Sequence, residues 1–153
     1  MGQGFVLTQA EKDSLVNARA ANAEVIFPYL RGDDINNELE QSSGLYAINF
    51  SMRELAECEQ EYPECVERIR TTVKPERDLV KRKANRERWW RYAEARPGLE
   101  SAVVDLGEVI VQPFTAKFLL PTFVDAKAVF AHPLVVIVKP AFYVYAVFTI
   151  RVA

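Results

Sequence analysis

The chain has 153 residues, 50% hydrophobic and 26% charged, which is enough for one domain with a substantial buried core. The net charge of −2 gives no sign of a polyanion-binding protein when it is averaged over the whole chain. Two cysteines seven positions apart, Cys58 and Cys65, and one histidine, His132, provide neither zinc-site spacing nor a disulfide framework. We therefore expect reduced thiols and no bound metal.

The N-terminal region is predicted to contain one helix and two strands. Its first residues, MGQGFVLTQAEKD, lack a basic leader and a sustained apolar region, so we expect no signal peptide and a cytoplasmic protein. Thr8 and Glu11 have capping-box spacing and predict a helix from about Gln9 to Arg19. EVIFPYL predicts a strand, a loop is expected at residues 32–34, and residues 45–50 predict a second strand.

Further helices are predicted in the middle of the chain. Ser51 and Glu54 repeat the capping-box spacing, which predicts a helix through about Gln60. Pro63 suits the first turn of another helix, running to about Thr72. Lys74 precedes a proline and should be extended, so a bend is expected there before residues 76–95 resume helix.

The remainder of the chain is predicted to be mostly sheet. LESAVVDL indicates a short helix, and strands follow in EVIVQPF, KFLLPTFV, AVFA, LVVIV and FYVYAVFTI. The last apolar run, from Leu134 to Ile150, is interrupted by Lys139 and Pro140, which favours a hairpin over a membrane span. We expect an α+β fold in a single domain of residues 1–153, helical in its N-terminal two-thirds and mainly antiparallel sheet thereafter, with no membrane insertion.

The charge is divided unevenly along the chain. Residues 68–96 hold eleven basic and four acidic residues, a net charge of +7, whereas the rest of the chain carries −9. One basic face on an acidic body can orient a protein on a DNA duplex. A solvated charged helix is the alternative. The candidate phosphate-binding residues in this interval are Lys74, Arg77, Lys81, Arg82, Lys83, Arg86, Arg88 and Arg91.

Two adjacent tryptophans, Trp89 and Trp90, lie among these cations in the stretch KANRERWWRYAEARPG. On a helix, neighbours point about 100° apart, so one ring could enter a core while the other stacks on a partner. Tryptophans are highly buried on average, so both rings could equally anchor the basic segment to the domain. We therefore expect a structural or a stacking role.

The sequence contains no clear catalytic constellation. The glycines of GQGFVL do not complete a dinucleotide-binding fingerprint, because Leu7 stands at the third glycine position. Asp33, Asp34, Glu38 and Glu40 could collect Mg²⁺ in a nuclease, but carboxylates beside a glycine turn are more often solvated. His132 is expected to be a loop residue and not a general base, because no serine or cysteine nucleophile motif accompanies it. We predict no catalytic and no metal-binding residues.

Five stretches of the sequence carry a family resemblance. FPYLRGDDIN, YAINF, YPE, VKPERD and RWWRYAEARPGL occur in this order, and together they resemble text in the fused restriction endonuclease and adenine-N6 DNA methyltransferase enzymes of the type IIG/IIL class. In that family this text follows the methyltransferase domain, where the target-recognition region begins. The resemblance covers residues 4–138, and residues 139–153 diverge from it.

The resemblance implies part of a DNA target-recognition domain of a restriction-modification enzyme. The expected partners are double-stranded DNA and the methyltransferase domain of a parent protein, where S-adenosylmethionine would bind. This chain has no Asn-Pro-Pro-Tyr-type motif, so we expect no cofactor in it and no enzyme activity of its own. Because Ala153 ends the chain directly after a strand pattern, we expect a fragment.

A protein-interaction or structural module is the alternative function. In that case the tryptophan segment and the C-terminal strands would dock on a partner domain, or an apolar edge at Val144 to Ile150 would form a homodimer by strand pairing. Salt separates the two hypotheses, because DNA binding weakens steeply with salt and apolar docking does not.

Overall fold

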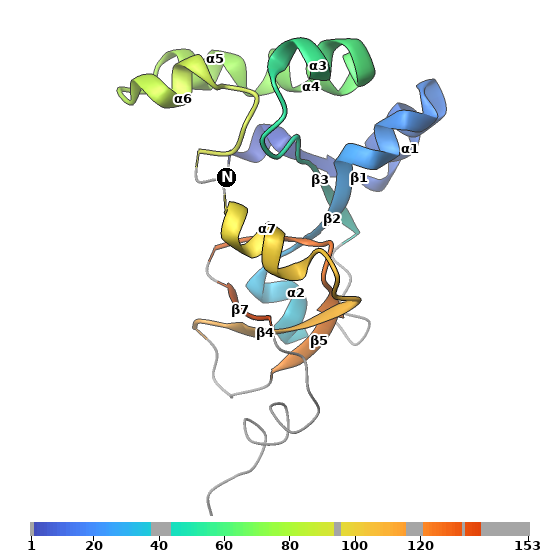
Figure 1. The fold of residues 1–153 in the computed structure, drawn as a ribbon, viewed down its shortest axis with the longest axis vertical. Helices are drawn as coiled ribbons and strands as arrows, with labels where there is room; N and C mark the ends of the chain where they lie inside the picture. Colours follow the sequence, from blue (N-terminus) through green and yellow to red (C-terminus); the bar gives the residue numbers. More distant parts are fainter. Residues whose placement is uncertain (1, 38–43, 94–95, 116–120, 133, 139–153) are drawn as a thin grey trace, which may run out of the picture. The chain divides into compact units, whose positions relative to one another are not determined.

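The computed structural model describes residues 2–37, 44–93, 96–115, 121–132 and 134–138, and it divides the chain into two compact units (Figure 1). Unit 1 comprises Met1–Phe27 and Gly44–Ala95, and unit 2 comprises Pro28–Ser43 and Arg96–Ala153. Helices predominate in unit 1 and strands in unit 2. The predicted α+β class is confirmed, and the assignment of both units to one domain stays a prediction.

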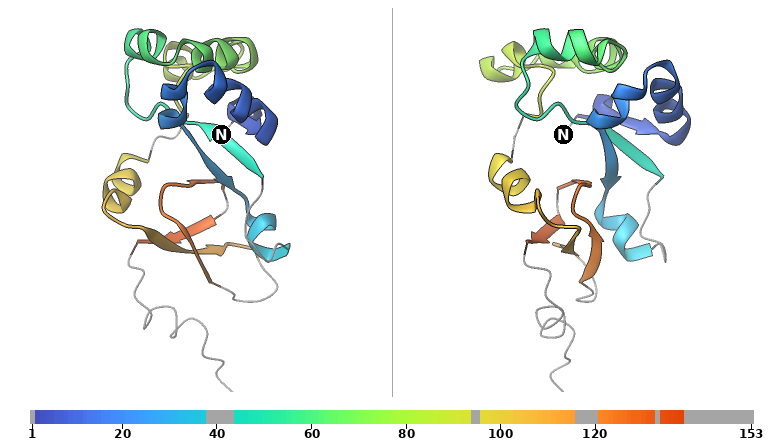
Figure 2. Two further views of the ribbon diagram at one scale, coloured as in Figure 1. Left: turned by 90° about the vertical axis from the view of Figure 1, so that its right-hand side faces the viewer. Right: turned by 45° about the vertical axis from the view of Figure 1, so that its right-hand side comes forward.

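Unit 1 combines short strands with helices, of which the green and yellow-green helices α3, α4, α5 and α6 lie together in one layer (Figures 1 and 2). Strands β1 and β3 pair antiparallel, with Val6 opposite Ala47 and Thr8 opposite Leu45. A further strand, β2 (Ile26–Leu30), crosses from unit 1 into unit 2. The other elements of unit 1 are η1 (Gln3–Phe5), β1 (Val6–Thr8), α1 (Gln9–Ala18), η2 (Ala20–Val25), β3 (Leu45–Ile48), α3 (Leu55–Glu61), α4 (Pro63–Thr72), α5 (Lys74–Asp78) and α6 (Lys83–Glu87).

Helix α4 supplies much of the core of unit 1. Cys65, Val66, Ile69 and Val73 recur at helical spacing and are all buried, so one stripe of the helix faces the core. Leu15 and Val16 of α1 pack against the same cluster. The other buried members are Phe5, Leu7, Val25, Ile26, Ile48, Phe50, Cys58, Tyr62, Trp89 and Trp90.

Unit 2 is built on a three-stranded antiparallel sheet in the order β5, β4, β7. Strand β6 adds a parallel pairing with the end of β2, where Tyr29 lies opposite Val129. The core gathers Leu30 and Ile35 with sheet residues such as Val109, Val111 and Val124. The predicted strand FYVYAVFTI lies outside the described residues. The elements are α2 (Gly32–Asn37), α7 (Pro97–Val103), β4 (Glu108–Pro113), β5 (Thr122–Asp125), β6 (Val129–Phe130) and β7 (Leu134–Ile137).

Four local predictions are wrong. Residues 76–95 do not form one resumed helix, because α5 ends at Asp78 and α6 spans only Lys83–Glu87. Residues 32–34 begin helix α2, not a loop, because Asp34 accepts a hydrogen bond from the backbone N–H of Arg31 at 2.7 Å in the manner of a first-turn carboxylate. Ser51 does not cap a helix: its φ of 52° is left-handed, and α3 begins at Leu55. Lys74 is helical because its proline neighbour falls in the first turn of α5, where a missing N–H costs nothing.

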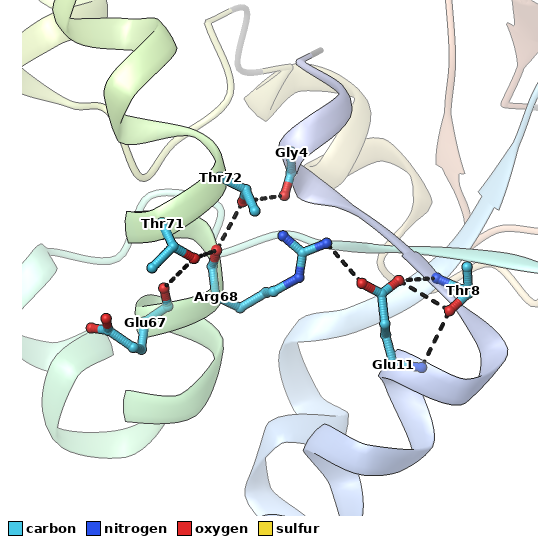
Figure 3. Close-up of polar contacts among 7 residues, drawn as sticks. All are labelled: Gly4, Thr8, Glu11, Glu67, Arg68, Thr71 and Thr72. Atoms are coloured by element: carbon cyan, nitrogen blue, oxygen red, sulfur yellow. Dashed lines mark hydrogen bonds and ion pairs between the residues drawn. The ribbon is translucent and has the colours of Figure 1, made fainter.

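The predicted capping box at α1 is present, and its Glu11 also forms an ion pair with α4 (Figure 3). Thr8 Oγ1 accepts from Glu11 N–H at 3.3 Å, and Glu11 accepts from Thr8 N–H at 2.8 Å. Arg68 of α4 donates to the same carboxylate at 2.9 Å. These contacts, the Thr8 N–H bond foremost, lower the pKa of Glu11 below its ordinary value of 4.5. The stability that these contacts give the folded protein is therefore fully present above pH 4.5, and it is lost as the pH falls through the lowered pKa of Glu11.

Replacement of Thr8 by alanine should lower the free energy of unfolding by about 1 kcal/mol, because it leaves an N-terminal amide of α1 without its acceptor. Urea denaturation at pH 7 measures the difference. Ser14→Ala, at an exposed position inside the same helix, is the control and should not destabilise the protein. Equal stability of the Thr8 variant and the parent would show that the cap contributes nothing.

Gly4 allows the N-terminal segment to lie directly against α4. A Cβ at this position would come within 2.8 Å of Val73 Cγ2 and 2.9 Å of the Thr72 carbonyl, and Thr72 Oγ1 donates to the Gly4 carbonyl at 2.9 Å (Figure 3). This glycine therefore serves close backbone packing.

Candidate nucleic-acid interface

The acidic residues considered for Mg²⁺ are not gathered into a metal site in the part of the chain that the structure describes. The Asp34 carboxylate accepts from Arg31 Nε at 3.1 Å and Nη2 at 2.8 Å, in addition to the backbone bond. Asp33 is exposed, and Glu38 and Glu40 lie outside the described residues. His132 is exposed at the turn before β7. Asp34 thus serves the start of α2.

The two cysteines are buried and free. Burial raises the pKa of the Cys58 thiol to about 11 and that of Cys65 to about 12. Both thiols are therefore protonated at neutral pH, and a protonated thiol is neither a nucleophile nor a metal ligand.

Both tryptophans belong to the core of unit 1. Trp89 is 6% and Trp90 7% exposed, and their rings meet edge to face with centroids 6.2 Å apart. The tryptophans follow the end of α6, so the helical spacing of neighbours does not apply to them, and both rings can turn inward. The structural alternative accounts for both residues, because stacking on a base needs an exposed ring face.

The residues around Trp90 hold the turn between β3 and α3. Trp90 Nε1 donates to the Arg53 carbonyl at 3.1 Å. Arg91 donates to the Met52 carbonyl at 2.6 Å, to the Arg53 carbonyl from Nε at 3.0 Å, and to the Glu54 carboxylate at 2.8 Å. The turn contains the left-handed Ser51, so these bonds hold a backbone that an L residue rarely adopts.

Arg77 and Arg91 are buried cations. The Arg91 side chain is only 8% exposed, and its guanidinium lies 5.4 Å from the Trp90 ring centre. Arg77 lies 6.0 Å from the ring centre of Phe5, and burial lowers the pKa of its guanidinium. Lys74, on the same short helix α5, pairs with Asp78 at 2.7 Å. Of these three predicted phosphate ligands, Arg77 and Arg91 are buried in unit 1 and Lys74 is paired with a carboxylate.

Arg86 joins α6 to the loop before it. Its Nη1 donates to the Val80 carbonyl at 2.7 Å and to the Lys81 carbonyl at 2.9 Å. These two bonds close the 79–82 loop against the helix and occupy one end of the guanidinium. Arg86 therefore positions the loop that carries its basic neighbours.

The remaining four predicted cations are exposed and lie close together in the sequence: Lys81, Arg82, Lys83 and Arg88. Lys83, 77% exposed, has one weak ion pair with Glu87 at 3.5 Å. Within the described residues, the side chains of Lys81, Arg82 and Arg88 make no ion pair and no hydrogen bond. By contrast, Arg68 pairs with Glu11, and Arg70 pairs with Glu59 and Glu67. The positive charge available to a ligand is thus concentrated at the 79–82 loop and along α6.

No helix in the described ranges has the length and apolar content needed to cross a membrane.

Comparison with known proteins gives one informative likeness. No protein-family model and no curated protein matches the sequence. The fold is similar to a structure of the type IIL restriction-modification enzyme MmeI in complex with DNA, with a TM-score of 0.71 and 14% sequence identity. The match covers 95% of this chain and 19% of that one, so this chain spans less than a quarter of that enzyme. At this identity the likeness shows a shared fold.

Proposed function

We propose that this chain is a DNA-binding module related to the target-recognition region of restriction-modification enzymes. In this proposal Lys81, Arg82, Lys83 and Arg88 contact the phosphates of a duplex. The observation that carries it is the exposure of these four cations, with carboxylate pairing confined to one weak contact at Lys83. The likeness to a restriction-modification enzyme solved with DNA, and the ordered sequence resemblance, support the same function.

The proposal divides the eight predicted cations by role. Arg86 holds the basic loop, while Arg77 and Arg91 anchor the segment in unit 1. Lys74 remains a weaker candidate because Asp78 already neutralises it. Phosphate contacts fix a protein on a duplex without reading its sequence, so the module would orient DNA. Catalysis, and with it S-adenosylmethionine, would belong to the methyltransferase domain of a parent protein.

The alternative of docking on a partner protein gains less support. The tryptophans that it would use are buried, and the apolar edge predicted at Val144 to Ile150 lies outside the described residues. We retain it as the outcome expected if salt has no effect on binding.

Removing exposed cations from the basic loop should make DNA binding less dependent on salt. The measurement is fluorescence anisotropy of a labelled mixed-sequence duplex over a salt series. The double variant Lys81→Ala, Arg82→Ala should reduce the slope of log K against log salt by about two units, and adding Lys83→Ala and Arg88→Ala should bring the reduction to about four, since each phosphate contact contributes roughly 0.9.

A matched control separates this surface from total charge. The double variant Arg96→Ala, Lys127→Ala also removes one exposed arginine and one exposed lysine, but from unit 2. It should leave the slope unchanged. Equal effects of the two double variants would mean that net charge alone governs binding, and no binding by the folded parent chain at low salt would refute the proposed function.

A further inference from the structure

Leu79 is the most exposed large hydrophobic side chain in the described ranges of the chain, at 87%. It follows the last residue of α5 and begins the 79–82 loop that leads into α6 (Figure 1). Its neighbour Val80 is half-buried. Two adjacent aliphatic residues in this loop therefore point to different environments, one toward the protein and one toward solvent.

The loop that presents Leu79 is held at several points. Leu79 N–H donates to the Glu76 carbonyl at 3.3 Å and Val80 N–H to the Arg77 carbonyl at 3.2 Å, which continue the turn of α5. Arg86 closes the other side of the loop through the carbonyls of Val80 and Lys81. On α5, directly before the loop, the guanidinium of the buried Arg77 lies 6.0 Å from the ring centre of Phe5. Leu79 is thus presented from a backbone with defined hydrogen bonds.

The surroundings of Leu79 in the chain are cationic. Lys81, Arg82 and Lys83 follow after Val80, while Asp78, the acidic neighbour, is paired with Lys74. A single exposed leucine is ordinary on a protein surface and needs no partner. An exposed leucine on a fixed loop with three exposed cations matches instead the design of architectural DNA-binding proteins, where an apolar side chain enters a base step and cations hold the flanking phosphates.

We propose that Leu79 is a wedge, which enters a groove of the bound duplex and partly unstacks one base step while Lys81, Arg82 and Lys83 hold the backbone. The inference rests on the proposed function and adds a deformation of the DNA to it. Unstacking is least costly at flexible pyrimidine–purine steps such as TA and CA. The module therefore favours duplexes with such a step at the bound site.

Fluorescence of 2-aminopurine tests the wedge directly, because its emission rises when the base is unstacked. Duplexes carry the probe at a central TA step or inside a stiff A-tract, and saturation is followed independently by anisotropy. The parent chain should raise the emission at the TA step. Leu79→Ala should abolish this rise. It should also weaken binding about tenfold, because the leucine side chain is no longer buried against the DNA. The salt slope should stay unchanged, because no phosphate contact is lost. Leu79→Phe should preserve the rise.

The control variant is Val104→Ala, which truncates another highly exposed aliphatic side chain, 72% exposed, in unit 2. It should change neither emission nor affinity. If the parent binds DNA with a steep salt slope but no probe position brightens, the wedge is refuted and the proposed function stands. If the parent binds vesicles of anionic phospholipid through Leu79 and leaves the DNA probe unchanged, the residue serves a membrane surface and the wedge is refuted as well.

Discussion

Replacement of Trp90 by alanine should lower the free energy of unfolding of unit 1 by about 4 kcal/mol, because it removes the largest type of side chain from a packed core. Trp90 is 7% exposed and meets Trp89 edge to face. The surrounding helices can collapse only partly into the space, so the cost includes a cavity as well as lost burial. Urea denaturation followed by the fluorescence of Trp89 measures the change within the same unit.

Trp90→Phe separates packing from hydrogen bonding. It keeps an aromatic ring and loses the Nε1–H that donates to the Arg53 carbonyl. That carbonyl still accepts from Arg91, so it is not left unsatisfied, and we expect a loss of only about 1 kcal/mol. Equal losses for the alanine and phenylalanine variants would assign the effect to the hydrogen bond and contradict the packing argument.

Arg91→Ala should destabilise unit 1 by about 3 kcal/mol, the second large effect. Arg91 is the donor to the Met52 carbonyl and contributes two of the bonds to the Arg53 carbonyl. Its loss removes three hydrogen bonds from the turn with the left-handed Ser51, leaves the Arg53 carbonyl with Trp90 alone, and deletes a buried side chain from beside the Trp90 ring. The same urea titration provides the measurement.

Arg88→Ala is the matched control for Arg91, because it removes the same side chain three positions earlier in the chain, at an exposed site. Its effect on unfolding should stay within about 0.5 kcal/mol, while its effect on DNA binding should be the larger of the two. Arg91→Lys should recover little stability, since one ammonium cannot span the carbonyls of Met52 and Arg53. A loss of well under about 3 kcal/mol for Arg91→Ala would contradict the conclusion that Arg91 holds the turn.

The predictions that succeeded depend on local chemistry. The capping box at Thr8 and the proline at the first turn of α4 each specify a helix start through groups within four residues. The strands after residue 107 were predicted from short β-branched runs bounded by turn residues. In these stretches, local preference and tertiary packing agree.

The failed prediction of a helix start at Ser51 depends on partners far along the chain. Ser51 and Glu54 have capping-box spacing, but the turn they form is held by Trp90 and Arg91, nearly forty residues away. Such contacts also explain why the number of charged residues located the basic segment but did not show which of its cations are exposed. A cation bound to a backbone carbonyl has no signature in the sequence, because every residue supplies a carbonyl.

The division of unit 2 between two separate stretches of the chain bears on how the protein folds during synthesis. Helix α2 packs against β4, and Leu30 and Ile35 share a core with strands that begin at residue 108. Residues 28–37 are therefore made more than seventy residues before their partners, while all the core residues of unit 1 precede residue 93 in the chain. A synthesis rate of about 5–20 residues per second makes this a wait of several seconds. Unit 1 can fold before the wait ends, while residues 28–37 inside its sequence have no sheet to pack against.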